Sequence, residues 1–330
     1  MGSKLIINQL KLAYSPLSNR DFALLKDDTA IQANLMNSCL YAICQRSELY
    51  FSSLNYNSDD GILDVEIRQE NNSHVLQILI PLFQSCFKID PTKYVLIYAA
   101  SHNPNSYLDS MPMRFVSGFR IHEGEDDKIL GKFIVWFTPE KLLQNIWTGS
   151  VIADIEGNIR DFTKYRVLYV GKATDQRVWQ RLSGHDTLQN ILSLEEPTVF
   201  GSLPTHETAI LFFTFKENTH IQGFGVKSTS REFVDLMLGH SLPSQKLIFL
   251  DAEKALINAM LPEYNKELFK NYPKSKDGLY SNSYDYISYT FTDPISLIYN
   301  LGEIRGGLNA FGGDKIIIEQ NKAMRLIKVD

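Results

Sequence analysis

A strand-forming run that ends at a glycine and leads into a basic segment constrains this chain more than any other feature. Residues 165–170 (YRVLYV) are rich in aromatic and β-branched residues, which favour a β-strand. Gly171 ends the run, and Thr174 or Asp175 can cap a helix that continues toward His185. The sequence therefore predicts a strand, a turn and a basic helix in direct succession.

Further strands and helices are predicted on both sides of this unit. Apolar and β-branched runs predict strands at 61–68, 74–82, 94–100, 132–138, 208–216 and 246–250, and a hairpin over 150–162 with its turn at Gly157-Asn158. Helices are predicted over 30–44, over 139–147 and from a cap at Asp251 to a stop at Pro262. The mixture predicts an α+β fold in which a small mixed β-sheet is flanked by helices.

The length of 330 residues favours two domains. The acidic run Glu123–Asp127 is typical of a solvated loop and is the best candidate for the boundary. We therefore expect an N-terminal α+β domain over residues 1–125, which serves recognition or partner binding, and a second domain over residues 126–330.

The net charge of −5 is unevenly distributed. Residues 164–181 hold five basic residues against one acidic residue, and residues 264–276 hold four against one, so the remainder of the chain carries −12. Such an asymmetry steers an anion toward the two basic segments. Two solvated surface faces would give the same pattern.

Other features bear on the compartment. Cys39, Cys44 and Cys86 form no even disulfide framework and show no zinc-finger spacing, which favours a reducing environment. The start of the chain lacks the pattern of a signal peptide, and the longest apolar stretch, residues 75–87, is too short to span a bilayer. We expect a cytoplasmic protein with no membrane partner.

Two separated segments resemble the GIY-YIG nuclease superfamily. Tyr169-Val170-Gly171 and the basic residues after it resemble the second half of the signature, and the matches to its acidic helix are Glu253, Pro262 and Asn265. An Arg followed by a His four residues later, here Arg181 and His185, resembles the restriction-endonuclease branch. The resemblance covers roughly residues 130–275 and implies a DNA endonuclease of the restriction or anti-phage defence type that uses Mg²⁺ and can act as a homodimer. RNA remains open as a target.

The resemblance also implies roles for single residues. Arg181 would stabilise the transition-state charge, and Glu253, placed in the first turn of its helix, would bind the metal. Asn265 would orient the acidic helix or the phosphate, while Lys172 would lower the pKa of a neighbouring tyrosine or hold a phosphate oxygen. The activating base is either Tyr169 or His185.

Three further residues are candidates for substrate binding. On one continuous helix, Arg177, Arg181 and His185 would form a basic stripe facing phosphate. Lys266 and Lys270 belong to the second basic segment and are assigned to substrate binding with Arg177.

The first half of the family signature is missing from its expected place. The strand over residues 133–137 (FIVWF) contains no tyrosine. Either the tyrosine is substituted, or Tyr165 or an N-terminal tyrosine such as Tyr98 supplies the hydroxyl, or the site is impaired. The last possibility motivates an alternative function, a catalytically impaired scaffold that binds nucleic acid or a nucleotide.

Asp154 and Glu156 are compatible with a second type of nuclease. Their spacing is similar to the first DxE element of exonucleases that use two metals, but no later partner carboxylates are convincing. A polar hairpin turn explains the segment as well.

Overall fold

The computed structural model describes residues 3–84, 87–101, 112–126, 131–225, 229–275, 277–282, 284–308, 312–320 and 322–329. Cys86, Asp127 and Lys276, which entered the expectations above, lie outside these ranges. The chain divides into two compact units. Unit 1 comprises residues 1–46, 164–196 and 203–330, and unit 2 comprises residues 47–163 and 197–202. The predicted boundary near residue 125 is therefore corrected, because the strands on either side of it, β8 (Val116–Gly124) and β9 (Lys132–Phe137), are paired in one sheet of unit 2.

Unit 1 is built on a ten-stranded mixed sheet with the order β15-β14-β11-β3-β12-β1-β13-β16-β17, and β2 pairs with β12 beside this path. The strands are β1 (Lys4–Leu12), β2 (Leu17–Ser18), β3 (Leu40–Gln45), β11 (Lys164–Lys172), β12 (Thr208–Gln222), β13 (Tyr286–Phe291), β14 (Ser296–Tyr299), β15 (Gly302–Arg305), β16 (Lys315–Glu319) and β17 (Arg325–Ile327). The α+β class is confirmed, although this sheet is larger than expected.

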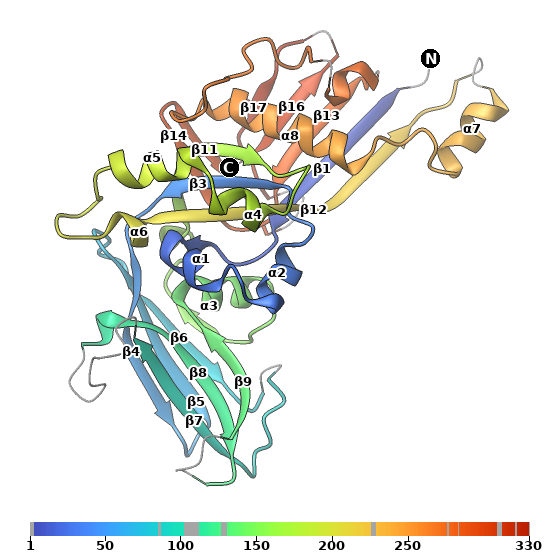
Figure 1. The fold of residues 1–330 in the computed structure, drawn as a ribbon. Helices are drawn as coiled ribbons and strands as arrows, with labels where there is room; N and C mark the ends of the chain where they lie inside the picture. Colours follow the sequence, from blue (N-terminus) through green and yellow to red (C-terminus); the bar gives the residue numbers. More distant parts are fainter. Residues whose placement is uncertain are drawn as a thin grey trace. The chain divides into compact units, whose positions relative to one another are not determined.

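The helices of unit 1 are α1 (Asn19–Leu25), α2 (Thr29–Leu35), α4 (Val178–Ser183), α5 (Asp186–Leu194), α6 (Pro204–Glu207), α7 (Ser230–Met237) and α8 (Gln245–Met260). The longest of them, α8, packs against β11, and Figure 1 shows it beside the sheet. Among the described residues, no helix is long and apolar enough to cross a membrane.

Unit 2 has its own hydrophobic core. One sheet has the order β10-β6-β5-β4 and the other the order β7-β8-β9. The strands are β4 (Leu49–Asn57), β5 (Ile62–Gln69), β6 (Leu76–Pro81), β7 (Tyr94–Ser101), β8 (Val116–Gly124), β9 (Lys132–Phe137) and β10 (Asp154–Glu156), with helix α3 (Pro139–Trp147) between β9 and β10. Most of these elements were predicted, but β10 pairs with β6, so the predicted hairpin over 150–162 is wrong. Asp154 and Glu156 are exposed on this strand.

The predicted helix over residues 30–44 is really a helix followed by a strand. The Asp28 side chain caps α2 by accepting hydrogen bonds from the backbone N–H groups of Ala30 and Ile31, and α2 ends at Leu35. All six residues of β3 are buried between β11 and β12. A continuous apolar run carries no periodicity that distinguishes a central strand from a buried helix.

Helix α8 begins earlier than predicted. The Ser244 side chain caps it by accepting a hydrogen bond from Leu247 N, so the predicted strand over 246–250 is wrong. Glu253 consequently lies in the middle of α8 and not in its first turn. The predicted stop is confirmed, because Leu261 adopts a left-handed conformation (φ 48°) directly before Pro262.

Asp251 is a buried hydrogen-bond acceptor and not a helix cap. Its carboxylate accepts hydrogen bonds from the hydroxyls of Tyr272 (2.8 Å) and Tyr289 (2.6 Å) and from Leu279 N (2.8 Å). Burial raises the pKa of this carboxyl, while the three donors act in the opposite direction. Since Tyr289 belongs to β13, the carboxylate connects α8 to the sheet.

We predict that Asp251→Ala lowers the free energy of unfolding by about 3 kcal/mol, because three buried donors lose their acceptor. Urea denaturation of the two proteins measures the difference. The control Asp235→Ala removes a partly exposed carboxylate near Arg231 and should change the stability by less than about 1 kcal/mol. Equal stability of Asp251→Ala and wild type would contradict the assigned role.

Candidate active site

Two tyrosines lie close together on the neighbouring strands β3 and β11. The strands are antiparallel, and the register places Tyr41 opposite Gly171. Tyr41 and Tyr169 are thus diagonal neighbours on one face of the sheet, with ring centroids 6.1 Å apart. Figure 1 shows β3 and β11 side by side. The tyrosine missing from the sequence pattern therefore has a structural candidate, Tyr41.

Gly171 makes room for the two rings. A Cβ atom at this position would lie 2.5 Å from Cε1 of Tyr169 and 2.7 Å from the hydroxyl oxygen of Tyr41. Real Cβ atoms essentially never show such contacts. The glycine after the strand is needed because both tyrosine side chains lie over its α carbon.

His185 is held by hydrogen bonds at both ring nitrogens. Its Nδ1 accepts a hydrogen bond from Leu188 N at 3.1 Å and thereby caps α5. Its Nε2 lies 3.0 Å from the hydroxyl oxygen of Tyr41. Burial and the charge of Arg181 lower the pKa of His185 to about 4. The imidazole is therefore neutral at pH 7, and because Nδ1 accepts a hydrogen bond, the proton is on Nε2 and is donated to Tyr41.

Arg181 lies close to both tyrosines. The pKa values of Tyr41 and Tyr169 are raised by burial, and the positive charge of Arg181 acts against this rise in each case. The Arg181 residue is exposed on α4. A cation that is open to solvent and adjacent to two hydroxyls is well placed for an anionic ligand.

The predicted basic stripe on one helix is wrong. Helix α4 ends at Ser183, and His185 caps the separate helix α5. Arg177 precedes α4 and donates a hydrogen bond from its guanidinium to Met36 O at 3.3 Å. The glycine Gly184 breaks the helix between Arg181 and His185, so the three residues do not follow a single helical face.

Lys172 and Glu253 form an ion pair beside Tyr169. Lys172 is the last residue of β11, and its Nζ lies 2.7 Å from Oε2 of Glu253. The Glu253 side chain is 10% exposed. Burial raises the pKa of the Glu253 carboxyl, and Lys172 acts in the opposite direction. The carboxylate of Glu253 in turn contributes to the raised pKa of Tyr169.

Asn265 fixes the segment after α8 to β11. Its side-chain oxygen accepts a hydrogen bond from Val170 N (2.9 Å), and its side-chain nitrogen donates one to Val170 O (2.8 Å). The backbone N–H of Tyr264 also donates to Leu168 O (3.0 Å). These hydrogen bonds fix the position of the segment that follows α8 along β11.

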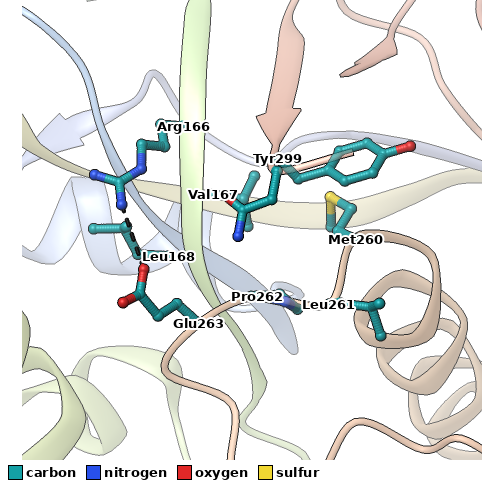
Figure 2. Close-up of a pocket in the computed structure, with 9 residues that line it drawn as sticks. Arg166, Val167, Leu168, Met260, Leu261, Pro262, Glu263 and Tyr299 are labelled. Atoms are coloured by element: carbon teal, nitrogen blue, oxygen red, sulfur yellow. Dashed lines mark hydrogen bonds and ion pairs between the residues drawn. The ribbon is translucent and has the colours of Figure 1, made fainter. Parts of the chain in front are cut away.

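A small pocket lies where this segment meets β11 (Figure 2). It is lined by Arg166, Val167, Leu168, Met260, Leu261, Pro262, Glu263, Tyr299 and Asn300. Figure 2 shows Arg166 paired with Glu263, at 3.4 Å. The lining contains none of the predicted catalytic residues, so the pocket belongs to the attachment of α8 to the sheet.

The remaining predicted residues lie as follows. Lys266 and Lys270 are exposed after α8, in the segment that follows Asn265. Tyr165 is buried in β11, where its ring lies 5.8 Å from the guanidinium carbon of Arg46. Tyr98 and the strand over residues 133–137 belong to unit 2.

Glu253 is the carboxylate of this site that could take part in binding a cation, and its Oε2 is already paired with Lys172. Glu253 offers a carboxylate whose Oε1 accepts no hydrogen bond within the described part of the chain. Magnesium commonly takes one or two carboxylates and completes its coordination with water and phosphate oxygens. No group of three or more His, Cys, Asp or Glu residues that could hold a metal occurs among the described residues. A cation at Glu253 would therefore depend on water and substrate oxygens.

Comparison with known proteins adds no relative, because no family model, no curated protein and no solved structure matches the chain.

We predict that His185 makes the stability of the protein pH-dependent. In the unfolded chain this histidine binds a proton below about pH 6.5, whereas in the folded protein it does so near pH 4. The free energy of unfolding should therefore fall as the pH drops from 6.5 to 4. His185→Asn should show a smaller loss than wild type between pH 7 and pH 5 in urea denaturation.

The matched control is His240→Asn, at an exposed histidine near Asp235. It should keep the pH dependence of the wild-type protein. An identical loss of stability in His185→Asn and wild type would show that His185 is not buried in its neutral form.

Proposed function

We propose that the chain is a metal-dependent endonuclease that hydrolyses phosphodiester bonds of DNA. One observation carries the proposal: Tyr41 contacts both Tyr169 and His185 at a site next to Arg181. These residues come from β3, β11 and the segment of α4 and α5. Glu253 reaches the same place from α8 through Lys172.

The arrangement supports a reaction at an anionic group. Arg181 offers several N–H donors and keeps its charge at any working pH, so it can stabilise the added negative charge of a phosphodiester transition state. Lys172, three residues after Tyr169 on β11, pairs with Glu253 and holds its carboxylate near Tyr169. Charges of both signs at one site suit a phosphate oxygen and a cation together.

A tyrosine is the favoured base for activating water. His185 already carries its proton on Nε2 and uses Nδ1 as a helix cap, so neither nitrogen is free to accept a proton from water. The Nε2–H group instead stabilises negative charge on the Tyr41 oxygen. The pKa values of both tyrosines are raised in the protein. Both hydroxyls are therefore protonated at neutral pH, and only the tyrosinate form can accept the proton from water, so the cleavage rate should increase with pH above neutrality.

A divalent cation bound by Glu253 would polarise the phosphodiester and stabilise the leaving oxygen. Neutralisation of the Glu253 carboxylate would also remove one cause of the raised pKa of Tyr169. His185, Gly171 and Arg181 orient the two tyrosines.

The alternative, a scaffold that has lost cleavage, was motivated by a missing tyrosine. The position of Tyr41 on the neighbouring strand, beside Tyr169, favours the active enzyme over this alternative. A protein that only binds phosphate needs Arg181 but gains little from a buried carboxylate at Glu253.

We predict that the protein cleaves plasmid DNA in the presence of Mg²⁺ and that Glu253→Gln lowers the rate at least about 100-fold, since the carboxylate that would bind the cation is lost. Gel electrophoresis of the products measures the rate. EDTA should stop the reaction of the wild-type protein.

The control variant Glu232→Gln changes an exposed carboxylate that caps α7 and should cleave like wild type. Full activity of Glu253→Gln would contradict the proposed metal site. Intact plasmid and intact RNA in every reaction, with Mg²⁺ and with Mn²⁺, would contradict the proposed function.

A further inference from the structure

The sheet β7-β8-β9 of unit 2 has an unusual second face. Its inward residues, which include Ile97, Phe119, Ile121 and Phe137, belong to the core of unit 2. In an antiparallel sheet with one buried face, the other face normally carries polar residues. Here the other face, called the aromatic face, carries rings instead. Its side chains are Tyr94, Leu96 and Tyr98 of β7, Arg120 and His122 of β8, and Phe133 and Trp136 of β9.

Three of these rings are substantially exposed. Tyr94 is 55% exposed, Tyr98 39% and Phe133 49%. His122 lies between two of them, with ring centroids 5.6 Å from Tyr98 and 5.5 Å from Phe133. The imidazole is itself buried, so it holds the two larger rings apart at fixed positions. Exposed rings held in place by packing are typical of a binding surface.

The charges on the aromatic face are positive. The register places Arg120 between Tyr98 and Trp136. Lys141 of α3 adds a second cation, with its Nζ 3.8 Å from the centre of the Trp136 ring. Glu123 is the single acidic residue in the three strands, which are described in full, and the alternation of the strand places it on the opposite face.

This local charge contrasts with the rest of unit 2. Residues 47–163 contain 16 Asp and Glu residues but 9 Lys and Arg residues, a net charge of −7. An acidic unit binds phosphate poorly over most of its surface. The aromatic face combines cations with rings and lacks carboxylates, so it is the part of unit 2 that complements a nucleic acid.

We propose that the aromatic face binds unpaired nucleobases of a single-stranded nucleic-acid segment. Bases stack on aromatic side chains regardless of sequence, and arginine and lysine hold the adjacent phosphates. Bases in a continuous duplex are stacked on one another and offer no free ring face. The inference rests on the proposed function and specifies its substrate as DNA that contains an unpaired segment.

The test measures binding of a fluorescein-labelled oligothymidine of about twelve nucleotides by the full chain carrying Glu253→Gln, which avoids cleavage. Fluorescence anisotropy should show tighter binding to the single strand than to a duplex of the same length. Adding Tyr98→Ala and Phe133→Ala should weaken binding about ten-fold or more, since each lost stacking contact is worth a measurable factor. Arg120→Ala should weaken binding and reduce its salt dependence.

The matched control replaces two other exposed phenylalanines of unit 2, Phe115→Ala and Phe200→Ala, and should leave the affinity unchanged. If the double variant at Tyr98 and Phe133 fails to fold by circular dichroism, the single variant Tyr94→Ala at a more exposed ring serves as the test. Unchanged affinity in the folded variants, or equal affinity for single strand and duplex, would overturn the proposal, since binding would then not depend on stacking of unpaired bases.

The two proposals fail in different ways. Cleavage of plasmid without binding of the oligothymidine would overturn the role of the aromatic face and leave the nuclease proposal standing. Binding of the oligothymidine that depends on Tyr98 and Phe133, without cleavage of any nucleic acid, would overturn the nuclease proposal and leave the role of the aromatic face standing.

Discussion

The pairing of β3 with β11 is the constraint on which the candidate site depends. Its register sets Tyr41 opposite Gly171, and the missing side chain of that glycine lets the rings of Tyr41 and Tyr169 pack over the strand. The neutral imidazole of His185 then reaches the Tyr41 hydroxyl from the start of α5. A shift of β11 by one residue relative to β3 would place Tyr169 on the opposite face of the sheet from Tyr41.

The acidic helix is attached to the same strand by independent contacts. Asn265 pairs with the backbone of Val170, and Glu253 pairs with Lys172 two residues further along β11. Asp251 holds the other side of α8 to β13. Because the ion pair and the backbone hydrogen bonds share one strand, the carboxylate keeps its place relative to the tyrosines.

The local elements of the site could be predicted from the sequence, but its assembly could not. The run 165–170 and the stop at Pro262 gave β11 and the end of α8 correctly, because aromatic and β-branched residues and proline have strong local preferences. Tyr41 was missed because its strand is buried on both faces and lacks alternation. In addition, unit 2 is inserted between β3 and β11, so the two strands are far apart in sequence. The one sequence feature that could have predicted the strand is the run 40–43 (LYAI), which contains an aromatic and a β-branched residue like the run around Tyr169.

The central claim is that Tyr41 and Tyr169 belong to one phosphodiester-cleaving site, and the most direct test is the Mg²⁺-dependent cleavage rate of Tyr41→Phe. This change removes one hydroxyl and keeps the ring that packs over Gly171. The account predicts a rate at least about 100-fold below wild type, because a general base contributes a factor of this order. Tyr299→Phe, on β14, should cleave like wild type. Wild-type cleavage by Tyr41→Phe would contradict the account.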